Sequence, residues 1–355
     1  MDFADSPDEA EFRGRLRAWL RDEPSRADWH RSLYDAGFFG LSWPEAVGGH
    51  GLPPVYDVIL DDELAAASAP PRPSVGYLLH GILEYGNADI QARFLPGIVS
   101  GREKWCQGFS EPEAGSDLAS LRTRAVRDGD DYVITGQKVW TSYSDVADWC
   151  LLLARTDADV ASHKGISAFV IAMQQPGIER RPIKMINGVT TEFGEVRFDG
   201  ARVPAANMVG SPGDGWKLAM TIVSHEREPG TLGFVGRYKK TVDELVRRVR
   251  TDASLHDGEA RRELAWALVE VEMLRAHVCR RLSDQLDGVT HGPAGSIDKL
   301  LMTATEQTVG HAALAIGKDD ASLSTYLYSR AQSVMGGASQ IQRNLVATRI
   351  LGLPR

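Results

Sequence analysis

The stretch Gln107-Gly-Phe-Ser-Glu-Pro-Glu-Ala-Gly-Ser-Asp117 and its companion Gly136-Gln-Lys-Val-Trp-Thr-Ser142 organise the rest of the sequence. The first is an apolar run that breaks into a Pro/Gly loop. It keeps the hydroxyls of Ser110 and Ser116, and Gly115 lets the backbone approach a ligand closely. The second ends a predicted strand. Backbone N–H groups and small hydroxyls beside an indole suit a flat, polar, redox-active ring, which we infer to be a flavin.

Length and composition describe an ordinary acidic protein. The 355 residues suffice for two or three domains with a sizeable core, and 43% are hydrophobic and 25% charged, with a net charge of -8. A nucleic-acid partner would need a basic face, so none is expected. The three cysteines, Cys106, Cys150 and Cys279, are far apart and form no Cys-x-x-Cys motif. We therefore expect no metal site and a reducing compartment.

The N-terminus predicts a cytoplasmic protein. Met1-Asp-Phe-Ala-Asp-Ser6 is acidic and lacks the apolar core of a signal peptide. No stretch of the sequence approaches the length of a membrane span.

The first and last thirds of the chain have helical patterns. Apolar residues at helical spacing predict helices over 8–22 and 29–39, and further helices over 55–68 and 75–85 with prolines between them. We expect 1–103 to be an N-terminal helical domain. After Gly215, four long amphipathic stripes predict a C-terminal four-helix bundle over 212–355, with the fourth helix running from Ser324 to Met335.

The middle of the chain, 104–211, has the pattern of strands. The segments 121–127 and 132–135 flank an Asp-Gly turn and predict a hairpin. Continuous apolar runs over 149–154 and 166–172 suit buried strands, and 195–204 adds another. Short strands with Gly/Pro turns favour a small barrel or sandwich, so the fold class is α+β multidomain.

Three strings resemble the acyl-CoA dehydrogenase family in order and spacing. They are Phe109-Ser-Glu-Pro-Glu-Ala-Gly-Ser-Asp117, Ile134-Thr-Gly-Gln-Lys-Val-Trp-Thr-Ser142, and Gln340-Ile-Gln-Arg343 with Arg349-Ile-Leu-Gly352. The resemblance covers the chain from about its first helix to its last residue. It implies an FAD-dependent enzyme of fatty acid metabolism that oxidises an acyl-CoA, or an acyl carrier protein thioester, and passes electrons to an electron-transfer flavoprotein. A homodimer, a homotetramer or a heterotetramer with a related subunit is expected.

The resemblance also assigns the flavin and substrate contacts. The flavin-binding positions are Gln107, Phe109, Ser110, Gly115, Ser116, Trp140, Thr141, Ser142, Ala338 and Gln340. Trp140 is expected to shield one face of the flavin, although an indole beside a strand also suits a core. Ser142 is expected to donate a hydrogen bond to flavin N5. Ser116, Arg227 and Gly337 are the expected substrate contacts.

The catalytic base departs from the family pattern. Many relatives carry a glutamate in a Tyr-Glu-Gly-Thr-Ser string, whereas this sequence reads Met335-Gly-Gly-Ala-Ser339. Either the base lies elsewhere or the chain is a catalytically silent subunit. Glu226, directly before Arg227, matches the alternative base position of the family, so we expect Glu226 to be the base. Gly336 still offers a backbone N–H to the thioester oxygen. Glutamates in such runs are otherwise solvated helix residues paired with an arginine.

Two further points stay open. The stretch Pro229–Tyr238 lacks the family's contacts to the adenine of FAD, so a partner chain is expected to supply them. A flavin oxidase or monooxygenase on the same scaffold is a third interpretation, and reactivity with O2 would distinguish it.

Overall fold

The computed structural model describes residues 4–22, 27–73, 76–226, 234–255, 258–289 and 292–354. The chain divides into two compact units. The sheet unit comprises Glu45–Gly48 and Pro73–His225. The helical unit comprises Met1–Pro44, Gly49–Arg72 and Glu226–Arg355. The domain boundaries at 103/104 and 211/212 stay a prediction.

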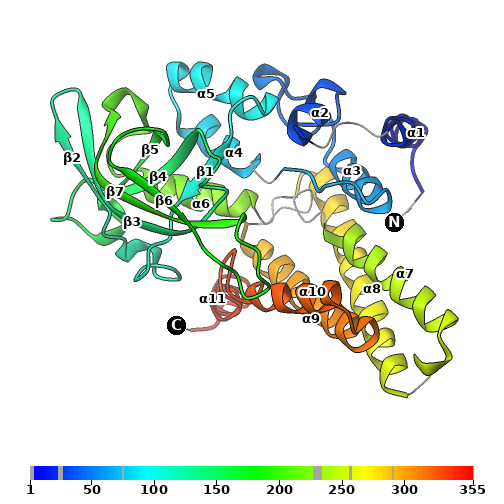
Figure 1. Ribbon diagram of the computed structural model, residues 1–355. Helices are drawn as coiled ribbons and strands as arrows, with labels where there is room; N and C mark the ends of the chain where they lie inside the picture. Colours follow the sequence, from blue (N-terminus) through cyan, green and yellow to red (C-terminus); the bar gives the residue numbers. More distant parts are fainter. Residues whose placement is uncertain are drawn as a thin grey trace. The chain divides into compact units, whose positions relative to one another are not determined.

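One eight-stranded sheet forms most of the sheet unit (Figure 1). Its strands run in the order β6-β7-β3-β2-β4-β5-β8, and β1 pairs with β4 beside this path. Their bounds are β1 Trp105–Gly108, β2 Arg124–Asp128, β3 Asp131–Ser142, β4 Trp149–Arg155, β5 Ile166–Ala172, β6 Ile178–Pro182, β7 Phe193–Pro204 and β8 Met208–Val209. The sheet is mixed, because β1 and β2 both pair with β4 in parallel.

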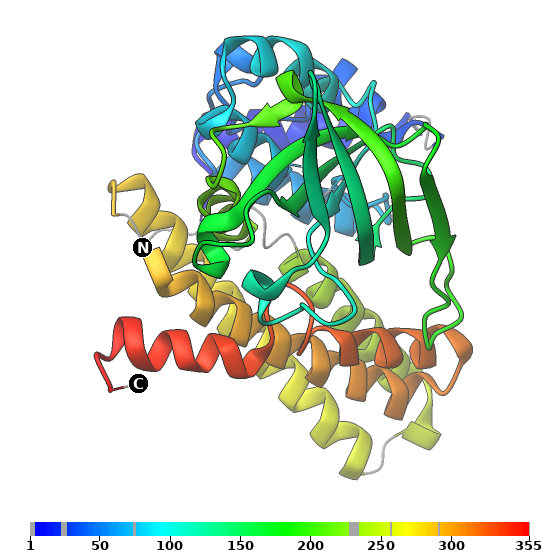
Figure 2. The same cartoon turned by 90° about the vertical axis from the view of Figure 1, so that its left-hand side faces the viewer.

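The predicted hairpin and buried strands are confirmed. β2 and β3 pair antiparallel, and Gly129 takes the positive φ of 62° that their tight turn requires. β4 and β5 are buried on both faces over most of their length, as continuous apolar runs predict. Figure 2 shows that the sheet is strongly curved. Its core is Cys106, Ala125, Tyr132, Ile134, Ala147, Cys150, Leu152, Ala154, Phe169, Ile171, Met173, Val196, Phe198, Ala201 and Val203.

Three helices belong to the sheet unit: α4 Gly76–Tyr85, α5 Ala88–Ser100 and α6 Gly215–His225. The Asn87 side chain caps α5 by accepting a hydrogen bond from the N–H of Ile90, and the helix ends at Gly101 in the left-handed conformation. α4 and α6 pack closely at Gly81, where a Cβ atom would stand 2.7 Å from the Ile222 side chain.

The N-terminal part of the helical unit contains α1 Pro7–Arg21, α2 Trp29–Asp35 and α3 Val55–Ala66. Ser6 and Glu9 form a capping box that fixes the start of α1. Arg13 and Arg17 of α1 each contact the Glu63 carboxylate of α3 at 2.7 Å. These ion pairs align α1 with α3.

The C-terminal part of the helical unit is the predicted bundle of long helices. It contains α7 Phe234–Thr251, α8 Gly258–Leu286, α9 Gly295–Gly317, α10 Asp320–Ala331 and α11 Ser339–Leu345, followed by a π-helical turn over Val346–Ile350. The helix predicted to reach Met335 ends at Ala331, and a turn follows. The bundle core includes Val242, Leu264, Val271, Leu274, Val278, Val309, Ala312 and Ile316. The predicted order of helical, β and helical regions is confirmed.

The described residues contain neither a membrane-spanning helix nor a cluster of metal ligands. None of the helices in these ranges combines the length and apolar character of a membrane span. Within the same ranges, no three His, Cys, Asp or Glu side chains gather as a metal site would require.

Candidate active site

In the sheet unit, the loop after β1 is fastened to β3 by one buried lysine. Lys138 lies on β3 with no exposed surface, and its Nζ donates to the Phe109 carbonyl at 2.9 Å and to Glu111 Oε1 at 2.8 Å. The Val139 N–H donates to the Ser110 carbonyl at 3.0 Å. The two sequence motifs are therefore held together at consecutive residues.

The Glu111 carboxylate, which pairs with Lys138, also accepts hydrogen bonds from the backbone. Glu111 accepts from the backbone N–H groups of Arg122 at 2.7 Å and Thr123 at 2.9 Å. Burial lowers the pKa of Lys138 to about 8, although the Glu111 carboxylate favours its charge. Burial also acts to raise the pKa of Glu111, but the Lys138 charge and these hydrogen bonds outweigh it, and the pKa is lowered. The pair is a structural anchor for the loop.

Trp140 stands out from the sheet. Its φ of 59° is unusual for a residue other than glycine, and the pairing of β3 with β7 is irregular between Lys138 and Thr141. The indole is 59% exposed and touches Phe193 edge-to-face at 6.1 Å. Trp140 is thus not a core indole but a flat, exposed apolar surface.

The neighbouring Thr141 offers an unused polar atom. Its side chain is 1% exposed, and its Oγ1 has no hydrogen-bond partner among the described residues. A buried hydroxyl without a partner is costly unless a ligand completes it. An exposed flat ring beside such a hydroxyl, over an anchored loop, fits a bound flavin.

The other predicted flavin contacts lie in the same unit. Gln107, Ser110 and Ser142 are half-buried, while Gly115 and Ser116 are exposed. No atom lies within 4 Å of a Cβ built on Gly115, so this glycine leaves room above the loop. Phe109 is buried and supplies the carbonyl that Lys138 holds.

In the helical unit, Glu226 lies beside Gly336. A Cβ atom built on Gly336 would stand 3.6 Å from Glu226 Oε1, and 3.4 Å and 3.8 Å from Cε and Nζ of Lys299. Glu226 is half-buried in the turn that follows α6, not on a solvated helix face. The carboxylate therefore occupies the space next to the position where the family's usual glutamate is missing.

The turn before α11 carries the remaining predicted positions of this unit. Gly336 and Gly337 have φ values of 63° and 99°, in the region that favours glycine. Ala338 is the N-cap of α11, and Gln340 is exposed on that helix. Arg227 lies outside the described residues, so its predicted contact with substrate stays a prediction.

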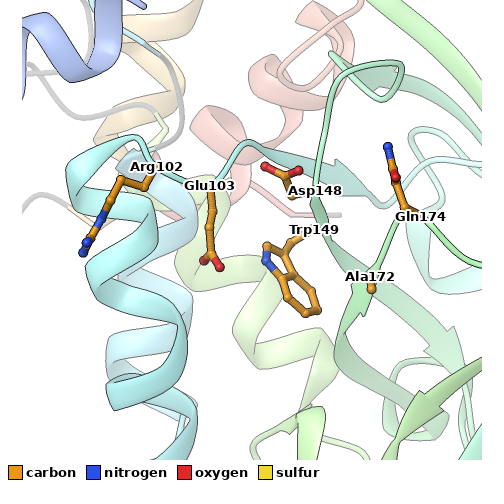
Figure 3. A pocket seen from close by; sticks show the side chains of 6 residues that line it. All are labelled: Arg102, Glu103, Asp148, Trp149, Ala172 and Gln174. Carbon is orange, nitrogen blue, oxygen red and sulfur yellow. The ribbon is translucent and has the colours of Figure 1, made fainter.

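A pocket elsewhere in the sheet unit contains none of the predicted residues. It has a volume of about 350 Å³ and is lined by Arg102, Glu103, Asp148, Trp149, Ala172 and Gln174 (Figure 3). Arg93 covers Trp149 through a cation–π contact of 5.2 Å and pairs with Glu103 at 3.0 Å. The ion pair with Arg93 compensates the charge of Glu103.

Lys138 and Glu111 lie inside the two sequence motifs, but the motifs alone do not predict that they pair. Two opposite charges within otherwise apolar or Gly/Pro-rich strings were the available signal. The sequence does not predict a role for Lys299. This residue lies on the long helix α9, and a lysine on a long helix is usually solvated.

Comparison with known proteins defines the class. The chain matches the acyl-CoA dehydrogenase N-terminal domain over residues 8–102, the middle domain over 106–201 and the C-terminal domain over 213–351. The chain belongs to the acyl-CoA dehydrogenase family. The predicted resemblance is confirmed, as is the fold class, and the protein is an FAD-dependent oxidoreductase of this family.

Three relatives illustrate the match. The chain is 37% identical to acyl-CoA dehydrogenase IpdE1 of Mycobacterium tuberculosis, with 98% of each chain covered. It resembles the solved Tcur3481-Tcur3483 steroid ACAD with a TM-score of 0.89 and 29% identity, over 100% of both chains. It also resembles the ChsE4-ChsE5 complex from Mycobacterium tuberculosis, with a TM-score of 0.84 and 27% identity over 100% of both chains.

Proposed function

We propose that this acyl-CoA dehydrogenase uses Glu226 as the base in the α,β-dehydrogenation of a bulky acyl-CoA. The observation that carries the proposal is the position of Glu226 Oε1, 3.6 Å from where a Gly336 side chain would begin. With a glycine at 336, no second carboxylate extends from that position toward Glu226. The C-terminal motif lacks the usual glutamate at position 336. In this proposal, Glu226, which follows α6, supplies the carboxylate in its place.

The reaction separates a proton from a hydride. Glu226 takes the α proton of the thioester, and the electron pair of that C–H bond forms the new double bond as the β hydride leaves. Bound FAD supplies the acceptor for that hydride. The Gly336 backbone N–H is assigned to the thioester oxygen, because a fixed donor there stabilises the developing negative charge. Ser116, Gly337 and Arg227 are assigned to substrate binding.

The sheet unit holds the flavin in this proposal. Gln107, Phe109, Ser110, Gly115 and Ser116 form the loop beneath it, Trp140 covers one face, and Thr141 and Ser142 offer hydroxyls. Ala338, the N-cap of α11, and Gln340 on α11 are also assigned to flavin binding in this proposal. The exposed indole of Trp140 and the orphan hydroxyl of Thr141 support this assignment.

The relatives support a proposal for the substrate class and the partners. One relative is described as a steroid ACAD and another as a complex of two differently named chains. We infer a steroid-type acyl-CoA as substrate, a related partner subunit that completes the adenine site, and an electron-transfer flavoprotein as acceptor. A base at Glu226 favours bulky acyl groups by analogy with the family.

Anaerobic titration tests the function. The purified chain, alone and with a candidate partner subunit, is mixed with butanoyl-CoA, octanoyl-CoA or cholanoyl-CoA, a steroid whose side chain ends in a CoA thioester. We expect a yellow protein that bleaches fastest with cholanoyl-CoA. Bleaching by none of the three, with flavin bound, would support a silent subunit. Rapid O2 uptake by the reduced enzyme would support an oxidase.

A further inference from the structure

A buried polar network lies behind the proposed base. Lys299 of α9 is 5% exposed, and its Nζ donates to the carbonyl of Gln332 at 3.0 Å and to Gln332 Oε1 at 2.9 Å. Thr303, one helical turn further along α9, donates to the same carbonyl at 3.2 Å. Gln332 directly follows α10, so these bonds fix the start of the segment that leads to Gly336.

The ammonium group also lies close to Glu226. Lys299 Nζ and Glu226 Oε1 stand 3.8 Å and 3.6 Å from one point, the Cβ position of Gly336. Their separation cannot exceed the sum of these two distances. Within this limit, an opposite charge favours the ionised form of the carboxylate.

We propose that Lys299 is a positioning residue for the base, which keeps Glu226 ionised and holds the Gly336 turn beside it. The inference rests on the proposed role of Glu226. Both of the Gln332 acceptors are neutral, and a nearby carboxylate balances the charge of the buried ammonium. The missing side chain at Gly336 leaves the space in which a lysine and a glutamate can approach each other.

Other ionisable groups of the network come from α7 and α9. Glu306 of α9 is buried and accepts a hydrogen bond from the Tyr238 hydroxyl of α7. Burial raises the pKa of Glu306, while Tyr238 and the charges of Lys299 and Arg237 act against that rise. Glu306 is therefore the competing partner for Lys299, and a test must separate its effect from that of Glu226.

Infrared titration of the carboxyl group gives a direct readout. The C=O stretch of protonated Glu226 is isolated by subtracting the spectrum of the E226Q holoenzyme across a pH series, without substrate. In K299M we expect the protonation midpoint to rise by about one pH unit or more, because the carboxylate loses its positive neighbour. The acid limb of kcat/KM with cholanoyl-CoA should move to higher pH by the same amount.

Matched variants complete the experiment. K299R keeps the charge and should retain a midpoint close to the unmodified protein, while K239M, at an exposed lysine of α7, should change nothing. If K299M does not fold, Q332M, which removes one acceptor of the ammonium, should shift the midpoint in the same direction by less. An unchanged midpoint in K299M, or an equal shift in E306Q alone, would overturn the inference. Full bleaching of the flavin in E226Q by substrate would instead reject Glu226 as the base. That result is distinct from a failure of the Lys299 proposal, which the protonation midpoint of K299M measures.

Discussion

The sheet unit and the helical unit hold their predicted site residues in opposite ways. In the sheet unit, the predicted flavin contacts lie in two short strings that Lys138 joins through a buried ion pair with Glu111. In the helical unit, Glu226, Lys299 and Gly336 are far apart in sequence and meet around the space of one absent side chain. In the sheet unit, the loop with the predicted flavin contacts depends on one buried ion pair. In the helical unit, the residues around Gly336 come from separate segments, so a single substitution can change their arrangement.

The difference predicts that substitutions at the ion pair of the sheet unit mainly change stability, whereas substitutions around Gly336 mainly change the reaction. A buried pair such as Lys138 and Glu111 fixes a loop whatever the substrate, so changes there should damage folding and flavin retention together. The residues around Gly336 should alter the reaction rate and its pH dependence while the fold persists. Each of the following predictions challenges one side of this contrast.

The largest expected effect on stability is at the anchor of the sheet unit. K138M leaves the buried Glu111 carboxylate uncompensated, which costs about 3–5 kcal/mol in the free energy of unfolding. The loop after β1 should loosen and FAD should be lost. Urea denaturation and flavin absorbance measure both, with K104M, at an exposed lysine of the same unit, as control. A K138M protein with unaltered stability would show that other contacts hold the loop after β1.

A smaller effect is expected at the turn of the helical unit. Gly336 has a φ of 63°, and a Cβ there would meet its neighbours only at ordinary contact distance. G336A should therefore destabilise the protein through backbone strain alone, by roughly 1–2 kcal/mol. G14A, in the interior of α1 with open space around it, should stabilise the protein by about 0.5–1 kcal/mol. A change in unfolding temperature in the same direction for G336A and G14A would contradict the role assigned to the positive φ of Gly336.

Trp140 should affect flavin affinity without affecting the fold. Its indole is 59% exposed, so W140A should change the stability of the flavin-free protein by less than about 0.5 kcal/mol. Loss of the ring contact should weaken FAD binding by about tenfold. Y143A is the matched control, because Tyr143 is also exposed and has a positive φ at the same end of β3. Equal flavin affinities in the two variants would remove Trp140 from the site.

A pH dependence of stability is expected at the anchor of the sheet unit. The pKa of Lys138 falls from 10.5 to about 8 on folding, so between these values the unfolded chain holds a proton that the folded chain has released. Stability from this group therefore rises with pH in that window, by up to roughly 1 kcal/mol per pH unit. The difference in unfolding free energy between the natural protein and K138M should widen from pH 8 to pH 10. A constant difference would contradict the lowered pKa.

Sequence patterns predicted the sheet unit better than the helical unit. The β2–β3 hairpin, the buried runs of β4 and β5 and the predicted flavin contacts of this unit lie within continuous strings, where local pattern and local structure coincide. The parallel pairing of β1 and β2 with β4 was beyond such patterns, because it joins segments through long connections.

The network around Gly336 shows the limit of sequence reasoning. Glycine at 336 and glutamate at 226 were noticed through family resemblance, but their proximity depends on how the chain returns after α10. Lys299 has no local signal, since a lysine on a long helix is usually solvated. Only its burial and its bonds to Gln332 mark it.

Anaerobic single-turnover bleaching of the E226Q enzyme by cholanoyl-CoA tests the central assignment most directly. Glutamine keeps the shape of the side chain but cannot accept the α proton. We predict that the flavin stays bound while its reduction slows by at least about 100-fold, as removal of a general base commonly produces. Reduction of E226Q at the rate of the natural enzyme would contradict the account and place the base elsewhere.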